Sequence, residues 1–326
     1  MSLLFVHKYY SQRSMKWYLR HFPTATSFLA SGALITGEAS PGYLPYPDVA
    51  YLVSKRLPGP RIVVVVRNPL ERAWSSYRYN YVTPTIDLMK RGAFNEIPPG
   101  QPSDFYDNYL FSFEDMVIAE LAVLRKCVSP GGSAEVGALE KYGNTSWGQL
   151  AISKRQKHGL PPLADLDSFC YGGFVNSSVV RPQWAELVAK YPEKVVDQRN
   201  VHLKQSFIGR SLYTLPLEWW YALFPKRDIY FICTEELSDL SGMPLNELAR
   251  FLGLPDHNFS SIVQGGAYNV GGHTGYDHEI SWEVVKRDEE QGSEIPLSDN
   301  IRKEVLEFIK PFNERLFNLT GRRCNW

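Results

Sequence analysis

The segment from Arg61 to Tyr77 constrains the fold more than any other part of the chain. It reads Arg-Ile-Val-Val-Val-Val-Arg-Asn-Pro-Leu-Glu-Arg-Ala-Trp-Ser-Ser-Tyr. The five residues 62–66 are all β-branched, which is typical of a parallel strand buried on both faces. Pro69 suits the first position of a helix, with Asn68 as N-cap and Glu71 placed to complete a capping box. The segment therefore predicts a buried strand that ends at Arg67 and turns directly into a helix.

This junction is predicted to attract an anion. Arg67 provides a positive charge beside the free N–H groups of a helix start, which also favour negative charge. Helical spacing places Arg72, Ser75 and Tyr79 on one face of the helix. The opposite face, expected to point toward a core, carries Leu70, Ala73, Trp74 and Tyr77. Arg67 and Ser75 can both reach one phosphate. The alternative is an arginine that is only solvated, because charged side chains are mostly exposed.

The rest of the chain alternates strands with helices. Strands are expected at 2–10, 33–38 and 228–234. Helices are expected at 12–22, 47–57, 111–127, 213–224 and 244–252, and after Ser298. Residues 83–104 and 265–296 are predicted as loops. The pattern predicts one α/β domain over 1–326, with a mostly parallel central sheet flanked by helices and an irregular insertion at 128–205. Ligands of such sheets bind at the carboxyl ends of strands, where Arg67 falls.

The composition of the chain excludes few classes of function. The chain has 326 residues, 44% of them hydrophobic, and a formal net charge of zero, so overall charge does not point to a nucleic-acid partner. Basic residues outnumber acidic ones in 1–91 and 125–210, and acidic residues predominate elsewhere. A basic part that faces an anionic nucleotide or glycan would fit this asymmetry, as would simple solvated charge.

The four cysteines show no Cys-x-x-Cys spacing, so no metal site is expected. Cys233 lies in an apolar run, which favours a buried free thiol. Cys127 and Cys170 flank a polar stretch and can form a disulfide in an oxidising compartment.

Features of the secretory pathway are sparse. No signal peptide is visible, and no apolar run approaches the roughly 20 residues that span a bilayer. Four Asn-x-Ser/Thr sequons favour a secretory location weakly, because such tripeptides are common: Asn144, Asn176, Asn258 and Asn318.

The pattern Arg-Asn-Pro-x-x-Arg-Ala-x-Ser-x-Tyr resembles the 3′-phosphate-binding motif of sulfotransferases that use PAPS (3′-phosphoadenosine 5′-phosphosulfate). The resemblance implies a P-loop-NTPase-like sandwich in which Arg67 and Ser75 hold the 3′-phosphate and Arg72 assists. Residues 215–225, 229–237, 248–255 and 307–316 resemble the second half of Golgi carbohydrate sulfotransferases. The match covers most of 1–127 and 206–326 and is thin between them. Gly37-Glu-Ala-Ser resembles the chondroitin-type N-acetylgalactosamine 4-sulfate 6-O-sulfotransferases.

A glycine-rich loop at 268–276 occupies the place of the second nucleotide loop of that family. The resemblance implies that Gly275 and Tyr276 cover the cofactor, although Thr274 replaces the usual lysine. The alternative is a surface loop with tolerated glycines.

Two elements of the family are not found in the sequence. One is the phosphate loop, Lys-x-Gly-Thr-Thr or similar, and the other is a catalytic glutamate. His7 is the nearest candidate base, with a pKa suited to proton transfer, and a structural histidine is the alternative. Both gaps are explained if the chain is N-terminally incomplete. A full-length form is then expected to carry a membrane anchor and to reside in the Golgi lumen.

Three functions are compared on this basis. The first is transfer of a sulfuryl group from PAPS to a hydroxyl of a carbohydrate, such as a polysaccharide or a proteoglycan glycan. The second is a non-catalytic nucleotide- or glycan-binding protein with the same fold. The third is a P-loop kinase, against which the lack of Gly-x-x-x-x-Gly-Lys-Ser/Thr argues.

Overall fold

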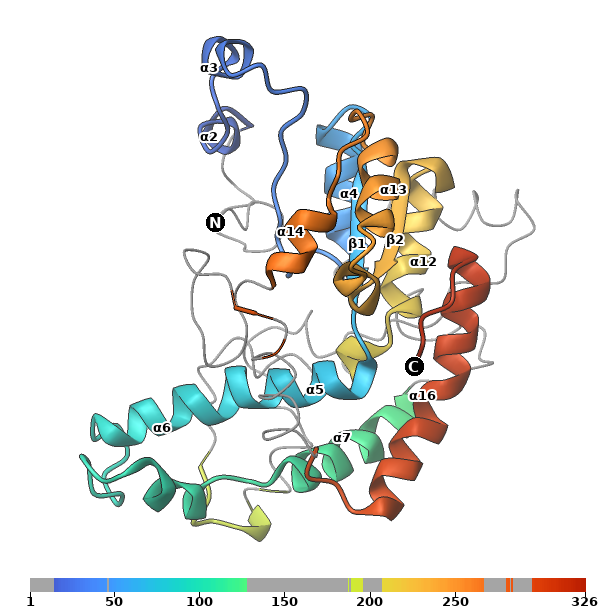
Figure 1. Cartoon of the computed structure of the whole chain (residues 1–326). Helices are drawn as coiled ribbons and strands as arrows, with labels where there is room; N and C mark the ends of the chain where they lie inside the picture. Colours follow the sequence, from blue (N-terminus) through green and yellow to red (C-terminus); the bar gives the residue numbers. More distant parts are fainter. Residues whose placement is uncertain are drawn as a thin grey trace.

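A computed structural model describes residues 15–45, 47–127, 187, 189–195, 207–266, 280–281, 283 and 295–326. At the centre of these residues lie two parallel strands, β1 (Ile62–Val66) and β2 (Ile229–Cys233) (Figure 1). Their register pairs Ile62 with Ile229 and Val66 with Cys233. The strand at 62–66 is confirmed, and the one at 228–234 is confirmed to within one residue at each end. A small parallel sheet among helices agrees with the predicted α/β class.

One face of this sheet forms a core with three helices. These are α4 (Pro47–Arg56), α12 (Thr214–Leu223) and the end of α16 (Asp299–Thr320). Val64 and Val66 point into that core, whereas Val63 and Val65 are 38% and 50% exposed. The prediction that β1 is buried on both faces is therefore wrong. Successive side chains of a strand alternate between faces, and the described residues cover only one face of β1.

A long helical run begins where β1 ends. α5 (Pro69–Tyr77) passes into a π-helical turn, η1 (Arg78–Val82), and then into α6 (Thr83–Lys90) (Figure 1). The loop predicted from residue 83 is therefore wrong over its first turns, before the 3₁₀ helix η2 (Ser103–Tyr109). Pro84 lacks an N–H and normally interrupts a helix. The wider π turn precedes it, with the Thr83 N–H bonded to the carbonyl of Arg78 five residues back, and accommodates the interruption.

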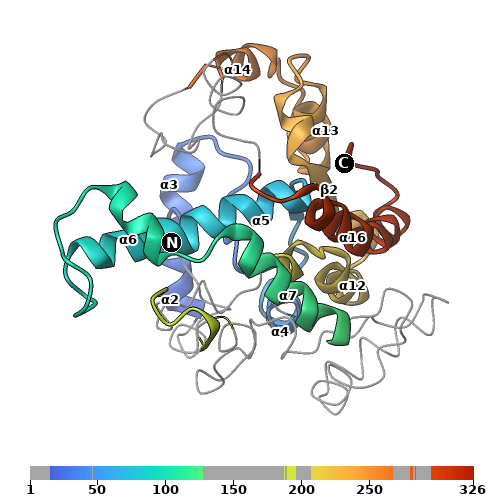
Figure 2. The ribbon, with the colours of Figure 1, turned by 90° about the horizontal axis from the view of Figure 1, so that it is seen from below.

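The second core lies below the sheet, where α5 packs on α7 (Phe113–Cys127) and α16 (Figure 2). Leu70, Ala73 and Tyr77 are buried in it, and Trp74 packs edge-on against Phe113. The predicted apolar face of α5 is thereby confirmed. Tyr77 also donates to the carbonyl of Phe111 at 2.7 Å, which ties the helix to the chain that precedes α7.

The smaller described elements are all helical. They are α2 (Met15–Leu19), α3 (Ala25–Ala30), η3 (Gly209–Ser211), η4 (Lys226–Asp228), η5 (Thr234–Ser238), α13 (Met243–Phe251) and α14 (Ser260–Gly265). Among them, α13 confirms the helix predicted at 244–252 to within one residue at each end. The strand expected at 33–38 is absent from this described segment, which is irregular, and α3 precedes it. The strand expected at 2–10 and most of the insertion at 128–205 lie outside the described residues.

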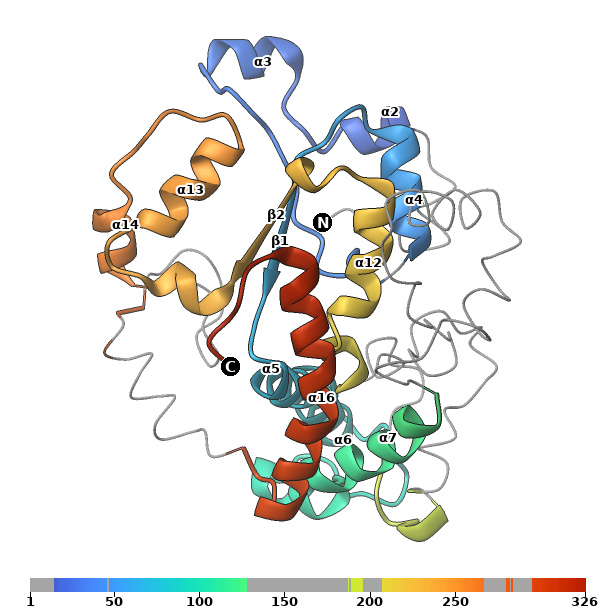
Figure 3. The same ribbon diagram turned by 90° about the vertical axis from the view of Figure 1, so that its right-hand side faces the viewer.

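A disulfide joins Cys233, at the end of β2, to Cys324, 91 positions later, with the two Cα atoms 5.8 Å apart. Both side chains are buried. The prediction of a free thiol at Cys233 is therefore wrong. Figure 3 shows α16 running beside the two strands and the C-terminal tail returning toward the start of α5. The expected pairing of Cys127 with Cys170 is untested, because Cys170 lies outside the described residues.

Candidate functional site

Arg67 begins the candidate site. It follows β1 directly, and its side chain is 41% exposed. Its Nε lies 3.0 Å from Oε2 of Glu71, which is 47% exposed. An exposed i,i+4 ion pair of this kind contributes only about 0.3–0.5 kcal/mol. An incoming anion can therefore replace Glu71 with little loss of stability.

The helix start differs from the capping box that the sequence predicts. Asn68 is the N-cap, as predicted, and its Oδ1 accepts from the N–H groups of Leu70 and Glu71 at 3.0 and 3.3 Å. The N–H of Asn68 itself donates to Oε1 of Glu235 at 3.1 Å, whereas Glu71 pairs with Arg67. Pro69 has no N–H. The first N–H donors of α5 are thus occupied, so attraction of an anion depends mainly on the Arg67 guanidinium.

Ser75 lies on the same exposed side of α5 as the Arg67–Glu71 pair. Glu71, Ser75 and Tyr79 follow one another at intervals of four residues, which places them along one face. All three are exposed. The hydroxyl of Ser75 makes no hydrogen bond to another residue in the described part of the chain. Arg67 and Ser75 therefore leave one continuous polar face open to solvent.

The side chain of Arg72, unlike that of Ser75, forms hydrogen bonds with other residues in the part of the chain that the structure describes. Its NH1 donates to the carbonyl of Phe207 at 2.8 Å, and its NH2 lies 3.4 Å from Oγ of Ser76. Ser211 adds a bond at 3.0 Å to the carbonyl of Pro69. Arg72 thus holds the chain at 207–211 against α5, and the described contacts give it a supporting role beside the candidate site.

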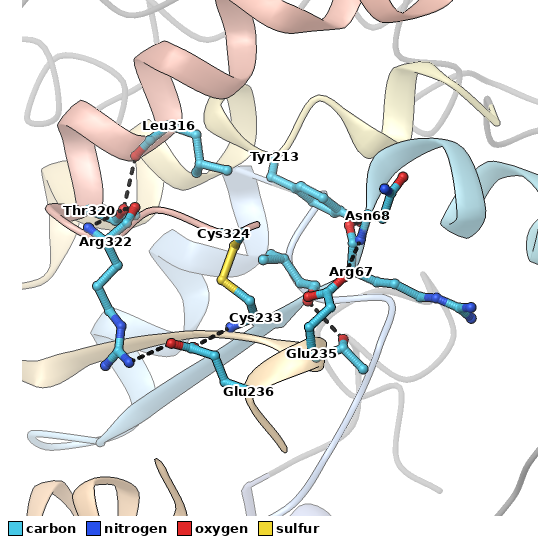
Figure 4. The surroundings of a disulfide bond; sticks show 12 residues. Arg67, Asn68, Tyr213, Cys233, Glu235, Glu236, Leu316, Thr320, Arg322 and Cys324 are labelled. Carbon is cyan, nitrogen blue, oxygen red and sulfur yellow. Dashed lines mark hydrogen bonds and ion pairs between the residues drawn. A yellow bond between two sulfur atoms is a disulfide. The ribbon is translucent and has the colours of Figure 1, made fainter. Parts of the chain in front are cut away.

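Residues of the second half of the chain hold the backbone around Arg67 (Figure 4). The Tyr213 hydroxyl donates to the Arg67 carbonyl at 2.9 Å, and the Thr234 hydroxyl donates to the Val66 carbonyl at 2.8 Å. Burial raises the pKa of Tyr213 above its usual value, so this phenol remains a neutral donor at ordinary pH. The sequence places Tyr213, Thr234 and Glu235 in or beside predicted elements, but none of the three was predicted as a site residue. A signal was available for Thr234 and Glu235, because they lie at the end of the predicted strand 228–234 and the carboxyl ends of parallel strands meet at one edge.

The other predicted site residues, His7, Gly275 and Tyr276, lie outside the described residues. Within the described ranges, no three His, Cys, Asp or Glu side chains come together as a metal site. The described part of the site is therefore an exposed cation at the carboxyl edge of a parallel sheet, a class of site suited to anionic ligands.

The comparison with known proteins points the same way. No family model matches the chain. It is 24% identical to "Membrane-associated sulfotransferase kil1" of Dictyostelium discoideum over 327 aligned residues, which is 99% of this chain and 59% of that protein. The chain thus spans about three-fifths of the relative's length. Among the described helices, none combines the length and the apolar character of a membrane span. The similarity supports a relationship to sulfotransferases in general.

Proposed function

We propose that the chain is a PAPS-dependent sulfotransferase that acts on a carbohydrate hydroxyl, built on a P-loop-NTPase-like fold. The observation that carries the proposal is the placement of Arg67. The motif that resembles the 3′-phosphate site of these enzymes lies at the carboxyl edge of the parallel sheet, with an exposed guanidinium and an exposed Ser75 on one face. The similarity to a sulfotransferase along nearly the whole chain supports the same class of reaction.

In this proposal Arg67 and Ser75 bind the 3′-phosphate of the nucleotide. A guanidinium presents several N–H donors to phosphate oxygens, and such charge-assisted bonds are about twice as strong as neutral ones. Glu71 gives up Arg67 when the phosphate arrives. Arg72 stabilises the position of the helix through its hydrogen bond to the carbonyl of Phe207. The loop that contains Gly275 and Tyr276 covers the nucleotide.

The reaction transfers one sulfuryl group. The oxygen of an acceptor hydroxyl attacks sulfur, the bond from sulfur to the 5′-phosphate oxygen breaks, and 3′,5′-ADP leaves. The hydroxyl proton passes to a base, for which His7 is the candidate. The acceptor class is a glycosaminoglycan-like polysaccharide, and the chondroitin type is favoured by the Gly37-Glu-Ala-Ser segment.

The proposed location is the Golgi lumen. The Cys233–Cys324 disulfide supports an oxidising compartment, because disulfides persist in secreted and lumenal proteins and are rare in the cytosol. Membrane association of the relative agrees with a membrane-anchored full-length form, which belongs to the same proposal.

Calorimetry with 3′,5′-ADP and 5′-AMP tests the nucleotide assignment, because the two ligands differ only in the 3′-phosphate. The wild-type chain is expected to prefer 3′,5′-ADP. Arg67→Ala should weaken its binding by about 1.5–3 kcal/mol, roughly 10- to 150-fold, and should remove the preference. Arg91→Ala, an exposed arginine after α6, is the matched control and should change nothing. Equal binding of both nucleotides by the wild-type chain would refute the assignment.

Transfer is tested separately with labelled PAPS and chondroitin. Incorporation of label that Arg67→Ala strongly reduces supports the proposed enzyme. Tight binding of 3′,5′-ADP without transfer to any glycan acceptor would instead support a non-catalytic binding protein with this fold.

A further inference from the structure

The backbone that carries Arg67 is held at three consecutive positions. Thr234 donates to the carbonyl of Val66 at 2.8 Å, and Tyr213 donates to the carbonyl of Arg67 at 2.9 Å. The carboxylate of Glu235 accepts from the N–H of Asn68 at 3.1 Å. Figure 4 shows Tyr213 and Glu235 reaching this turn from opposite sides. None of these contacts touches the guanidinium, so they fix only the direction from which the Arg67 side chain leaves the backbone.

The segment that supplies two of these contacts has its own anchor. Cys233 precedes Thr234 and is bonded to Cys324. The N–H of Cys233 donates to Oε2 of Glu236 at 3.0 Å, and Oε1 of Glu236 pairs with Arg322 at 2.8 Å. The C-terminal tail is thereby joined to the end of β2 by a covalent bond and an ion pair within a few residues.

We propose that Glu235 is a positioning residue for Arg67 and that the Cys233–Cys324 disulfide anchors it. In this arrangement the covalent link at the end of β2 maintains the anion affinity of the turn at the end of β1. The consequence for ligand binding rests on the proposed function, whereas the positioning itself does not.

The negative charge of Glu235 indicates that this residue helps by positioning the backbone and not by attracting the ligand. A carboxylate beside a phosphate site repels the ligand, so it would be a poor choice if only electrostatics mattered. Glu235 supplies the protein acceptor there, because Glu71, the local candidate for the Asn68 N–H, pairs with Arg67 instead. Glu235→Gln keeps a side-chain oxygen acceptor and removes the charge. Glu235→Ala removes both, so the two variants share their charge and differ in the acceptor.

Hydrogen exchange in the absence of ligand tests the positioning directly. In the full chain, Glu235→Ala should speed exchange of peptides that cover residues 66–70, and Glu235→Gln should restore slow exchange. The double variant Cys233→Ser/Cys324→Ser should also speed exchange there. Asp228→Ala is the matched control, since it removes a carboxylate contact at the opposite end of the same strands. Unchanged exchange in Glu235→Ala would overturn the proposal, whether or not the cysteine variant folds.

Affinity for 3′,5′-ADP tests the consequence. Glu235→Ala should bind about three- to tenfold more weakly than Glu235→Gln, the scale of one neutral hydrogen bond. Equal affinities of these two variants, with a wild-type chain that binds the nucleotide, would overturn the positioning role in binding. A wild-type chain that binds no 3′,5′-ADP, together with faster exchange in Glu235→Ala, would refute the proposed function and leave the positioning established.

Discussion

The two ends of the small parallel sheet are closed in very different ways. At the end where both strands begin, NH1 of Arg61 lies 3.0 Å from Asp228 and 2.9 Å from the carbonyl of Arg227, all near the surface. At the end where both strands stop, three side-chain hydrogen bonds and a buried disulfide converge on the turn around Arg67. Both ends share one ladder, so the ladder alone does not explain the difference.

The difference shows where accurate geometry is needed. In the proposed function, the Arg67 turn has to hold its donors in place before the ligand arrives, and support from surrounding residues achieves this. The opposite end only has to stop the strands from fraying. An ion pair near the surface is enough for that purpose, because such a pair contributes about 0–1 kcal/mol.

Among variants at the two ends of the sheet, the one without the disulfide should lose the most stability. The double variant Cys233→Ser/Cys324→Ser should lower the free energy of unfolding by about 2–5 kcal/mol, because the link constrains a long loop of the unfolded chain. Urea titration measures the change. A loss below about 1 kcal/mol would mean that the tail is held mainly by the ion pairs of Arg322 and by the ring contacts of Trp326.

Removing the hydroxyl of Tyr213 should have an intermediate effect. Tyr213→Phe keeps the ring and deletes the bond to the Arg67 carbonyl, so stability should fall by about 0.5–1.5 kcal/mol. Urea titration at neutral pH measures this change. Tyr221→Phe, on the helix that begins directly after Tyr213, provides the ring-matched comparison because no hydrogen bond of its hydroxyl is described.

The same variant changes stability in alkali. Burial raises the pKa of Tyr213 above 10.0, so between pH 10 and its raised pKa the unfolded chain releases a proton that the folded chain retains. The stability that this phenol contributes is complete below pH 10. It then falls by about 1.4 kcal/mol per pH unit until the raised pKa of the folded state is reached. The free energy of unfolding of Tyr213→Phe should therefore fall less steeply with pH, because one proton fewer is released on unfolding. An identical alkaline slope in both proteins would contradict burial of this phenol.

The smallest effect is expected at the opposite end of the sheet. Asp228→Ala removes the half-buried partner of the exposed Arg61 and should change the free energy of unfolding by no more than about 1 kcal/mol. A loss as large as that of the disulfide variant would show that the two ends contribute equally, contrary to the comparison above.

The sequence predicted what local chemistry determines. The strand formed by the β-branched run, Asn68 as N-cap, the apolar face of α5 and the helix after Ser298 all follow from neighbouring residues, and the structure confirms them. The position of Arg67 at the carboxyl end of a strand was predicted for the same reason.

The errors share a different cause. Glu71 is the local choice for the Asn68 N–H, but Glu235 takes it from 167 residues away. Cys233 lies in an apolar run, but its partner Cys324 is far along the chain. The exposure of Val63 and Val65 likewise depends on which elements cover the sheet. Each of these outcomes is decided by tertiary contacts that no local pattern contains.

The separation between the two strands has a consequence for synthesis of the protein. β1 finds its partner only after about 165 further residues have been made, since its register is with Ile229–Cys233. Until then, five uncharged β-branched residues form an unpaired strand, the kind of segment that associates with other chains. Arg61 and Arg67 flank it, and charges in such positions oppose aggregation. Arg67 therefore protects the growing chain long before any ligand can reach it.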